Sequence, residues 1–408
     1  MSSLPTPDIG RDAAARFVGD HLRHLICDEP SGSLRFRGGQ AAADEALRSF
    51  DVSGYDRRRN EVYPTPRRGA SALSPYIRHG LLTLDRVWQH VDGGPVSDVA
   101  KFRSELLWQE YARHWYARLG RSTRQGVRAD QPVVDASWNA AELYDRDMAC
   151  MDLTLGELEE DGWLVNQSRM WLASHWSVRS AAPWNEGEDF FFRHLIDGSR
   201  AANRLGWQWT AGLASAKSYS FSRWQVEERA AGLCASCEKV HDCPVETWPE
   251  PVAPVPHDEP VTLRKGNDAA IAGPATPIIS TAPDTVWLTA ESLGTADPAL
   301  VAHPDLPVVF VFDEPLLASL SLSGKRLVFL TETLAELATS RDLELRLGRP
   351  ADELRGRKVA VTHAPVPGFV RRSGDIGPVA VHPYPWYVRP NGGTVRSFSA
   401  WLRAIDLP

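Results

Sequence analysis

Three cysteines near residue 240 have a spacing that is typical of metal ligands. Two residues separate Cys234 from Cys237, and Cys243 follows, with a proline directly after it. Iron–sulfur clusters are held by four Cys thiolates, often in C-x2-C runs with proline after the last one. Cys150, in the segment DMACMD, is available as the fourth ligand. The pattern favours a [4Fe-4S] cluster. The alternatives are a zinc ion, for which His241 could replace one thiolate, and unligated thiols.

A second pair of residues could hold a polar ligand inside the molecule. Arg169 lies within an apolar segment, and Asp197 follows the apolar run FFFRHLI. A buried charge without a partner is very costly, so each of these residues needs the other. The pair predicts either a structural salt bridge in the core or an ion pair that holds the polar face of a cofactor.

Residues 56–79 are rich in arginine, although the whole chain has a formal net charge of −7. These arginines are Arg57, Arg58, Arg59, Arg67, Arg68 and Arg78. The acidic balance does not indicate nucleic-acid binding, but net charge can hide a local basic patch. The segment is interpreted either as a solvated loop or as a surface that faces the phosphates of a nucleic acid or of a cofactor.

The elements that must position these residues are predicted to be helices in the first part of the chain. Apolar residues recur at helical spacing over 71–87, 102–119, 153–175 and 187–203, and strand-like runs are nearly absent before residue 248. Ser74 is expected to cap a helix, with Pro75 at its first position. Residues 1–248 are therefore predicted to form an all-α domain. Closely spaced prolines over 249–280 predict a linker.

Short β-type runs begin after the linker and alternate with helical segments. They are 286–289, 308–312, 343–347, 358–362 and 379–381. This alternation predicts a small Rossmann-like α/β domain with a parallel sheet over residues 281–408. No apolar run is long enough to span a bilayer and no signal peptide is visible, so the protein is expected to be cytoplasmic. Its oligomeric state does not follow from the sequence.

Five segments resemble, in order and spacing, the FAD-binding helical domain of DNA photolyases and cryptochromes. They read RFRGGQAAADEALRSF, GASALSPYIRHGLLT, FRSELLWQEYARHW, GWLVNQSRM and LIDGSRAANRLGWQW. The residues after the linker, from TVWLTAESLGTADPALV onward, resemble the antenna domain that precedes the helical domain in this family. The chain therefore resembles a circularly permuted member with its antenna-like domain last. Residues 288–293 lack the usual charged signature of the first antenna loop, so the resemblance does not extend to binding of an antenna chromophore.

The resemblance implies noncovalent binding of FAD in the helical domain. The matched positions are Tyr55, Ser71, Leu73, Ser74, Arg169, Asp197 and Asn203. In the family these positions place the two serines by the pyrophosphate, the ion pair by the isoalloxazine ring and the asparagine at flavin N5. Trp207 and Trp184 match the first two members of the family's tryptophan relay. Core packing is the alternative role for each tryptophan.

The resemblance also implies a pocket for a cyclobutane pyrimidine dimer that is flipped out of damaged DNA. The matched positions are Glu105 and Asn166 for hydrogen bonds to the bases, Trp108 and Trp209 for stacking, and Met170 as an adaptable wall. The expected activity is that of a deoxyribodipyrimidine photolyase, in which excited reduced FAD donates an electron that splits the dimer. Val165 stands where (6-4) photolyases have a catalytic histidine, which argues against that lesion.

Three departures from the family pattern favour other functions. Ala70 replaces a hydroxyl residue, Gln109 replaces an arginine and Ser199 replaces an aspartate beside the flavin. These losses are compatible with a cryptochrome-like blue-light photoreceptor that repairs nothing. A third hypothesis is a DNA-processing protein that uses a metal cluster without light. The four cysteines resemble the ligands of the bacterial iron–sulfur branch of photolyases.

Overall fold

A seven-stranded sheet organises one side of the molecule. The computed structural model describes residues 2–132, 144–215, 217–248 and 253–407. The strands, in sheet order, are β1 (Ser2–Leu4), β7 (Leu343–Gly348), β6 (Val308–Asp313), β5 (Thr285–Leu288), β8 (Val359–Thr362), β9 (Ala380–His382) and β4 (Ile278–Ile279). The five central strands run parallel, and β1 and β4 pair antiparallel at the two edges. The predicted parallel α/β fold is confirmed.

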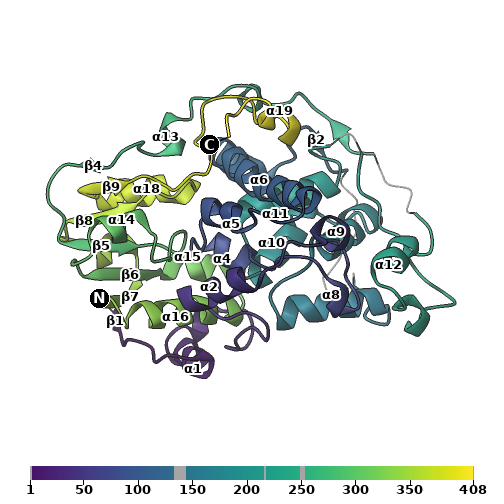
Figure 1. Cartoon of the computed structure of the whole chain (residues 1–408), viewed down its shortest axis with the longest axis horizontal. Helices are drawn as coiled ribbons and strands as arrows, with labels where there is room; N and C mark the ends of the chain where they lie inside the picture. The colour runs from purple at the N-terminus through teal and green to yellow at the C-terminus, as the bar shows by residue number, and fades with distance from the viewer. Residues whose placement is uncertain (1, 133–143, 216, 249–252, 408) are drawn as a thin grey trace.

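Both faces of this sheet are covered, which explains why β5, β6 and β8 are almost wholly apolar. The covering helices are α1 (Arg11–His21), α14 (Pro298–Ala302), α15 (Glu314–Leu320), α16 (Gly324–Leu337), α17 (Pro350–Glu353) and α18 (Pro367–Ile376). Alternate residues of β6 enter different cores: Phe310 packs in the same core as α1 and α16, and Val309 packs with Phe369 of α18. In Figure 1 the sheet and these helices fill the left of the view, and the helical part fills the right.

The N-terminal residues lie on the sheet side of the molecule, whereas the sequence predicts residues 1–248 as a helical unit. Strand β1 pairs with β7, and helix α1 packs against α16. The ring of Phe17 lies 6.4 Å from that of Phe312. An edge strand of three residues is held by backbone hydrogen bonds and needs no periodic apolar pattern, so the sequence SSL gave no signal of it.

The remaining part is helical, as predicted. Its helices are α2 (Gln40–Ser49), α3 (Tyr55–Arg58), α4 (Ser74–Arg78), α5 (Leu84–His90), α6 (Val96–Leu119), α8 (Ala149–Glu160), α9 (Asn166–Ser174), α10 (Trp184–His194), α11 (Arg200–Thr210) and α12 (Arg223–Arg229). A short ribbon of β2 (Ala129–Asp130) and β3 (Val255–Pro256) joins it to the next segment. Among the residues that the structure describes, no helix is long and apolar enough to cross a membrane.

Three of the predicted helices are interrupted. The segments 71–87, 153–175 and 187–203 each form parts of two helices. Gly80 and Gly162 adopt φ angles of 69° and 66° at two of the breaks, a left-handed conformation that favours glycine. Thr83 then begins α5 by accepting a hydrogen bond from the Arg86 amide. The third break, between α10 and α11, contains Asp197.

From residue 253 the chain leaves the helical part, enters the sheet and later returns to the helical part. Before β5 it contains β3, a 3₁₀ turn (Val261–Leu263), α13 (Ala269–Ala272) and the edge strand β4; residues 249–252 of the predicted linker lie outside the described residues. After β9 the chain leaves the sheet and returns to α6, where it ends in α19 (Phe398–Leu402). The sequence places all of residues 281–408 in the α/β domain, so this return was not predicted.

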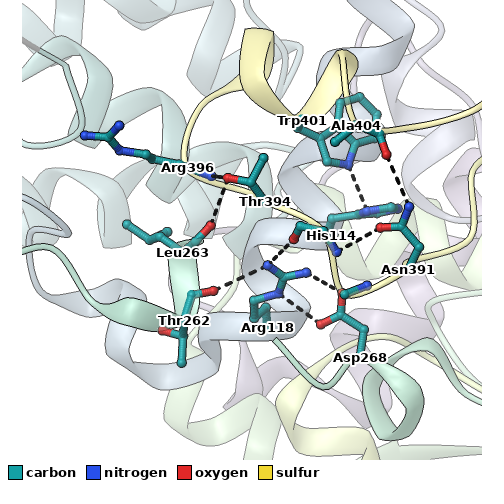
Figure 2. A network of polar contacts seen from close by, with 12 residues as sticks. His114, Arg118, Thr262, Leu263, Asp268, Asn391, Thr394, Arg396, Trp401 and Ala404 are labelled. Carbon is teal, nitrogen blue, oxygen red and sulfur yellow. Dashed lines mark hydrogen bonds and ion pairs between the residues drawn. The ribbon is translucent and has the colours of Figure 1, made fainter. Parts of the chain in front are cut away.

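A buried polar network fixes the C-terminal segment, residues 384–407, on α6 (Figure 2). The Glu110 carboxylate accepts the amide N–H groups of Tyr387 and Val388 at 2.8 and 3.0 Å. The His114 ring lies between the Val388 carbonyl and the Trp401 indole N–H, at 2.7 and 3.0 Å. Arg118 and Asp268 form an ion pair whose side chains are both nearly inaccessible to solvent. Because all of these groups are buried and paired, we infer that the segment is firmly held.

His79 gives the contact between the two parts a dependence on pH. Its ring packs 5.0 Å from that of Phe329, and burial together with Arg78 lowers its pKa to about 3. The unfolded chain binds this proton below about pH 6.5 and the folded chain does not. The free energy of unfolding is therefore expected to fall by up to about 1.4 kcal/mol per pH unit between pH 6.5 and 4 on account of His79.

Urea unfolding at several pH values measures this effect. The variant His79→Gln carries no titrating ring and is expected to have a shallower fall than the wild type. The exposed variant His90→Gln is the matched control and is expected to keep the wild-type fall. Equal slopes in all three proteins would show that the histidine at position 79 is protonated in the fold.

Candidate functional site

Arg169 and Asp197 form the ion pair that the sequence predicts. The Arg169 Nη2 atom lies 2.7 Å from Asp197 Oδ2, and Arg169 Nε donates to the Leu164 carbonyl at 3.0 Å. The Asp197 side chain is only 5% exposed. Its second oxygen, Oδ1, is buried and has no hydrogen-bond partner among the described residues. A buried acceptor of this kind is costly unless a ligand or water completes it.

Asn203 provides a second incomplete polar group close by in the chain. It lies in the second turn of α11 and is buried, and its Nδ2 atom has no acceptor within the described part of the chain. Asp197, on the loop that joins α10 to α11, thus offers an acceptor, and Asn203, in α11, offers a donor. Together they are suited to a polar ligand that carries both kinds of group.

Two arginines from different elements hold the loop that carries Asp197. The carbonyl of Gly198 accepts Arg78 Nε and Arg326 Nη2, each at 3.1 Å. Arg78 also makes a two-point ion pair with Glu291, with distances of 2.9 and 2.8 Å. Burial and the neighbouring Arg78 lower the pKa of Arg326 to about 9. Because Arg326 and Glu291 belong to the sheet side, the position of this loop depends on both parts of the molecule.

Of the predicted flavin-binding positions, Ser71, Leu73 and Ser74 lie at the start of α4, and Tyr55 is the first residue of α3. Leu73 and Tyr55 are buried, and Ser71 is half-buried. The expected cap is wrong: Leu73 is the capping residue and Ser74 is the first residue of the helix. The Ser74 hydroxyl instead accepts the indole N–H of Trp163 at 2.9 Å. This contact ties α4 to the segment that leads into α9.

Trp207 and Trp184 both lie in the apolar core of the helical part. The Trp207 ring meets that of Phe191 edge to face, at a centroid distance of 5.0 Å, and is 2% exposed. A β-carbon on Gly187 would lie 2.2 Å from the Trp207 ring, so only glycine permits this close approach of α10 and α11. The indole N–H of Trp207 is buried without an acceptor among the described residues.

The residues predicted to contact a lesion lie on three helices that pack together, α6, α9 and α11. Glu105 of α6 pairs with Lys101 at 3.1 Å and with Arg59 at 3.5 Å. Trp108 and Trp209 are 37% and 42% exposed. Asn166 is exposed at the start of α9 and Met170 is half-buried one turn later. The structure therefore puts two accessible indole rings on adjoining helices.

One aromatic residue at this surface was missed by the sequence prediction. Phe398, from the C-terminal segment, stacks on Trp108 with ring centroids 4.1 Å apart and planes inclined by 13°. The two residues are far apart in the chain, and Phe398 lies in a segment without a clear pattern. Only the return of the chain to α6 brings them together.

The four predicted metal ligands face one hollow between α8, α12 and the loop that follows. Cys150, Cys234, Cys237 and Cys243 all line it, and its volume is about 330 Å³, including space that opens to solvent. Burial and the other three thiols raise the pKa of Cys150 to about 12. Within the described ranges, no three His, Cys, Asp or Glu side chains converge closely enough to bind a single metal ion.

Part of the chain is similar in sequence to known DNA photolyases. Residues 102–231 match the model of the FAD binding domain of DNA photolyase. A deoxyribodipyrimidine photo-lyase of Synechococcus sp. is 28% identical over 199 residues, which cover 44% of this chain and 40% of that protein. The enzyme of the same name from Vibrio cholerae is 32% identical over 162 residues, 36% of this chain and 33% of the relative. The matches thus span less than half the length of these curated relatives.

Solved structures give weaker likenesses. A Synechocystis cryptochrome aligns with a TM-score of 0.42 and 20% identity, over 50% of this chain and 46% of that one. A bacterial class III photolyase from Agrobacterium tumefaciens aligns with a TM-score of 0.41 and 24% identity, over 55% of this chain and 46% of that one. The sequence matches relate residues 102–231 to the photolyase/cryptochrome family.

Proposed function

We propose that the protein binds FAD in its helical part and repairs cyclobutane pyrimidine dimers in DNA under blue light. The observation that carries the proposal is the Arg169–Asp197 ion pair with unpaired polar atoms at Asp197 Oδ1 and Asn203 Nδ2. The isoalloxazine edge of FAD has both N–H donors and oxygen and nitrogen acceptors, so it suits these two groups. When bound in its reduced form, FAD supplies the electron that light makes available to the dimer.

The protein's own residues bind and orient the reactants. Arg169 pairs with the Asp197 carboxylate and holds it in place, and Gly198 is fixed by the two arginines that donate to its carbonyl. For the lesion, Trp108 and Trp209 offer exposed rings on which the flipped bases can stack. Glu105 on α6 and Asn166 on α9 supply hydrogen-bonding groups for the bases. The tight packing of α6, α9 and α11 keeps these two sets of residues in one fixed relation.

We further propose that the chain is a circular permutation of the usual domain order, with the helical domain over residues 1–248 and the antenna-like domain over 281–408. The sheet order β7-β6-β5-β8-β9, with strands that run parallel, supports a Rossmann-like second part. The segment that precedes the helical part also packs on this sheet, through β1 and α1.

A [4Fe-4S] cluster bound by the four cysteines is also part of the proposal. The four side chains line one hollow but do not converge as the ligands of a single zinc ion do. In a four-iron cluster each thiolate binds its own iron, so the sulfurs lie farther apart than around one ion. The proposal of a cluster rests on the four-thiolate set and its C-x2-C spacing, and zinc is the alternative.

Dimer disappearance under light tests the proposed repair. The protein is loaded with FAD, reduced, mixed with UV-irradiated oligonucleotide and either lit with blue light or kept dark, and the dimers are counted by chromatography. Repair is expected only in the lit sample. A flavin-loaded protein without light-dependent repair would instead support the photoreceptor hypothesis, which the departures at Ala70, Gln109 and Ser199 favour.

Trp207→Phe is expected to slow the light-driven reduction of bound FAD about tenfold or more, which corresponds to about 1.4 kcal/mol in the barrier. A phenylalanine fills most of the indole volume but is much harder to oxidise. Transient absorption of the FAD-loaded protein measures the rate. Trp171→Phe is the matched control, because Trp171 is equally buried and packs on Phe221 at 5.5 Å. Equal slowing in both variants would mean that Trp207 serves only in packing.

A further inference from the structure

Three arginines from distant parts of the chain surround one glutamate beside the C-terminal segment. Arg264 Nε and Arg396 Nε lie 3.0 and 2.8 Å from Glu259 Oε1, and Arg128 Nε lies 3.5 Å from Oε2. We call Arg128, Arg264 and Arg396 the arginine cluster. Glu259 compensates one of the three guanidinium groups, so these four side chains sum to +2, and Asp130 and Asp258, close by in the chain, reduce this local excess.

Most of this positive charge is open to solvent. The Arg264 and Arg396 side chains are 67% and 54% exposed, while that of Glu259 is 11% exposed. Figure 2 shows the Arg396 side chain pointing away from the network around His114 and Arg118 that fixes its segment. The buried Glu259 carboxylate therefore holds the guanidinium groups together, and the exposed parts of Arg264 and Arg396 can still bind an anion.

The backbone that carries Arg396 is held in place. The Val395 amide donates to the Leu263 carbonyl at 2.8 Å, and Thr394 Oγ1 donates to the same carbonyl at 3.3 Å. Arg128 donates a hydrogen bond to the carbonyl of Arg396 itself. A charged group on a fixed backbone loses little entropy when it binds a ligand, which favours a built binding surface over a mobile one.

The cluster adjoins the stacked rings of Trp108 and Phe398. Phe398 follows Arg396 by two residues, and the hydroxyl of Tyr111, on α6, donates to the Val395 carbonyl at 3.0 Å. Guanidinium groups that bind phosphates next to accessible aromatic rings are the combination by which proteins bind nucleic-acid strands. The overall charge of −7 hides this local patch.

We propose that the arginine cluster binds backbone phosphates of DNA beside the Trp108–Phe398 stack, so that the linker and the C-terminal segment form part of the DNA-binding face. The inference rests on the proposed function, since that function names DNA as the partner. It adds residues that no family match supplied: the positions matched to a lesion pocket all lie on α6, α9 and α11.

The salt dependence of DNA binding tests this inference. The full-length protein is titrated in the dark into a fluorescent, undamaged DNA duplex at several salt concentrations, and anisotropy gives Kd. For the double variant Arg264→Gln/Arg396→Gln, the slope of log Kd against log salt is expected to fall by about 2, with binding about tenfold weaker at low salt. Arg355→Gln is the control, because this arginine is 78% exposed and pairs with Asp352 on the sheet side.

The variant Glu259→Gln separates the inference from misfolding, because misfolding would weaken DNA binding whereas this variant is expected to strengthen it. Loss of the central carboxylate frees one more positive charge, so tighter binding and a steeper salt slope are expected. An unchanged slope in the double variant, or an equal loss in Arg355→Gln, would overturn the inference. If the slopes change as expected but irradiated dimers persist under light, the inference stands and the proposed repair function is wrong.

Discussion

Arg169→Met is expected to abolish the retention of FAD and to lower the free energy of unfolding by about 3–5 kcal/mol. The substitution leaves the Asp197 carboxylate buried, with a side chain that is 5% exposed, and removes the guanidinium group that pairs with it. It also removes the donor that fixes the Asp197 side chain opposite the proposed flavin. Absorbance of the protein after reconstitution with FAD measures retention, and urea unfolding measures stability.

Two further variants separate binding from packing. Arg146→Met breaks an exposed pair of contacts with Asp152 and Glu159, and is expected to change stability by less than about 1 kcal/mol and to leave FAD binding intact. Arg169→Met/Asp197→Leu removes both buried charges, so most of the stability is expected to return while FAD is still lost. Normal FAD uptake by the double variant would show that the ion pair is purely structural.

The Arg169–Asp197 pair could be predicted because its cause is local. Each residue is a charge in an apolar stretch of sequence, and the cost of an unpaired buried charge requires a partner. The same holds for the parallel strands: the run over 308–312 is continuously apolar, the run over 343–347 alternates leucine with charged residues, and both became strands close to the predicted bounds. Local composition decided these features, so the sequence sufficed.

Other features depend on contacts between segments that are distant in the sequence, so no local sequence pattern predicts them. Strand β1 exists only because the edge of β7 is open to it. The stack of Phe398 on Trp108 and the network of Glu110 require the C-terminal segment to return to α6. The predicted start of α4 was wrong for a related reason. Ser74 has the chemistry of a helix cap, but the Trp163 indole competes for its hydroxyl.

The same long-range contacts bring residues from outside the helical part to the candidate site. The loop with Asp197 is held by Arg326, which comes from the sheet side, and the surface near Trp108 includes residues from the linker and the C-terminal segment. Residues 102–231 carry the family match, yet groups on both sides of this segment complete its geometry. The helical part therefore depends on the rest of the chain for its functional shape, and variants should be tested in the full-length protein.

Cys150→Ser is expected to abolish metal binding. The purified wild type is expected to contain about four iron atoms and four sulfides per chain and to be brown, and the variant neither. Loss of the cluster removes the link between α8 and the loop of residues 234–243, so the variant is also expected to unfold at a lower urea concentration. Elemental analysis and the visible spectrum measure the metal. FAD is expected to remain bound, because Asp197 and Asn203 do not line this hollow.

Cys27→Ser is the matched control for this change. Cys27 is exposed and lies outside the hollow, so its substitution is expected to leave iron, sulfide and stability unchanged. One zinc per chain in place of iron would overturn the cluster and require the four thiolates to move closer together than they lie now. Iron lost equally from both variants would point to adventitious binding. Iron lost from Cys150→Ser alone assigns the cluster to the four cysteines around the hollow, since Cys150 is the one ligand that comes from outside residues 234–243.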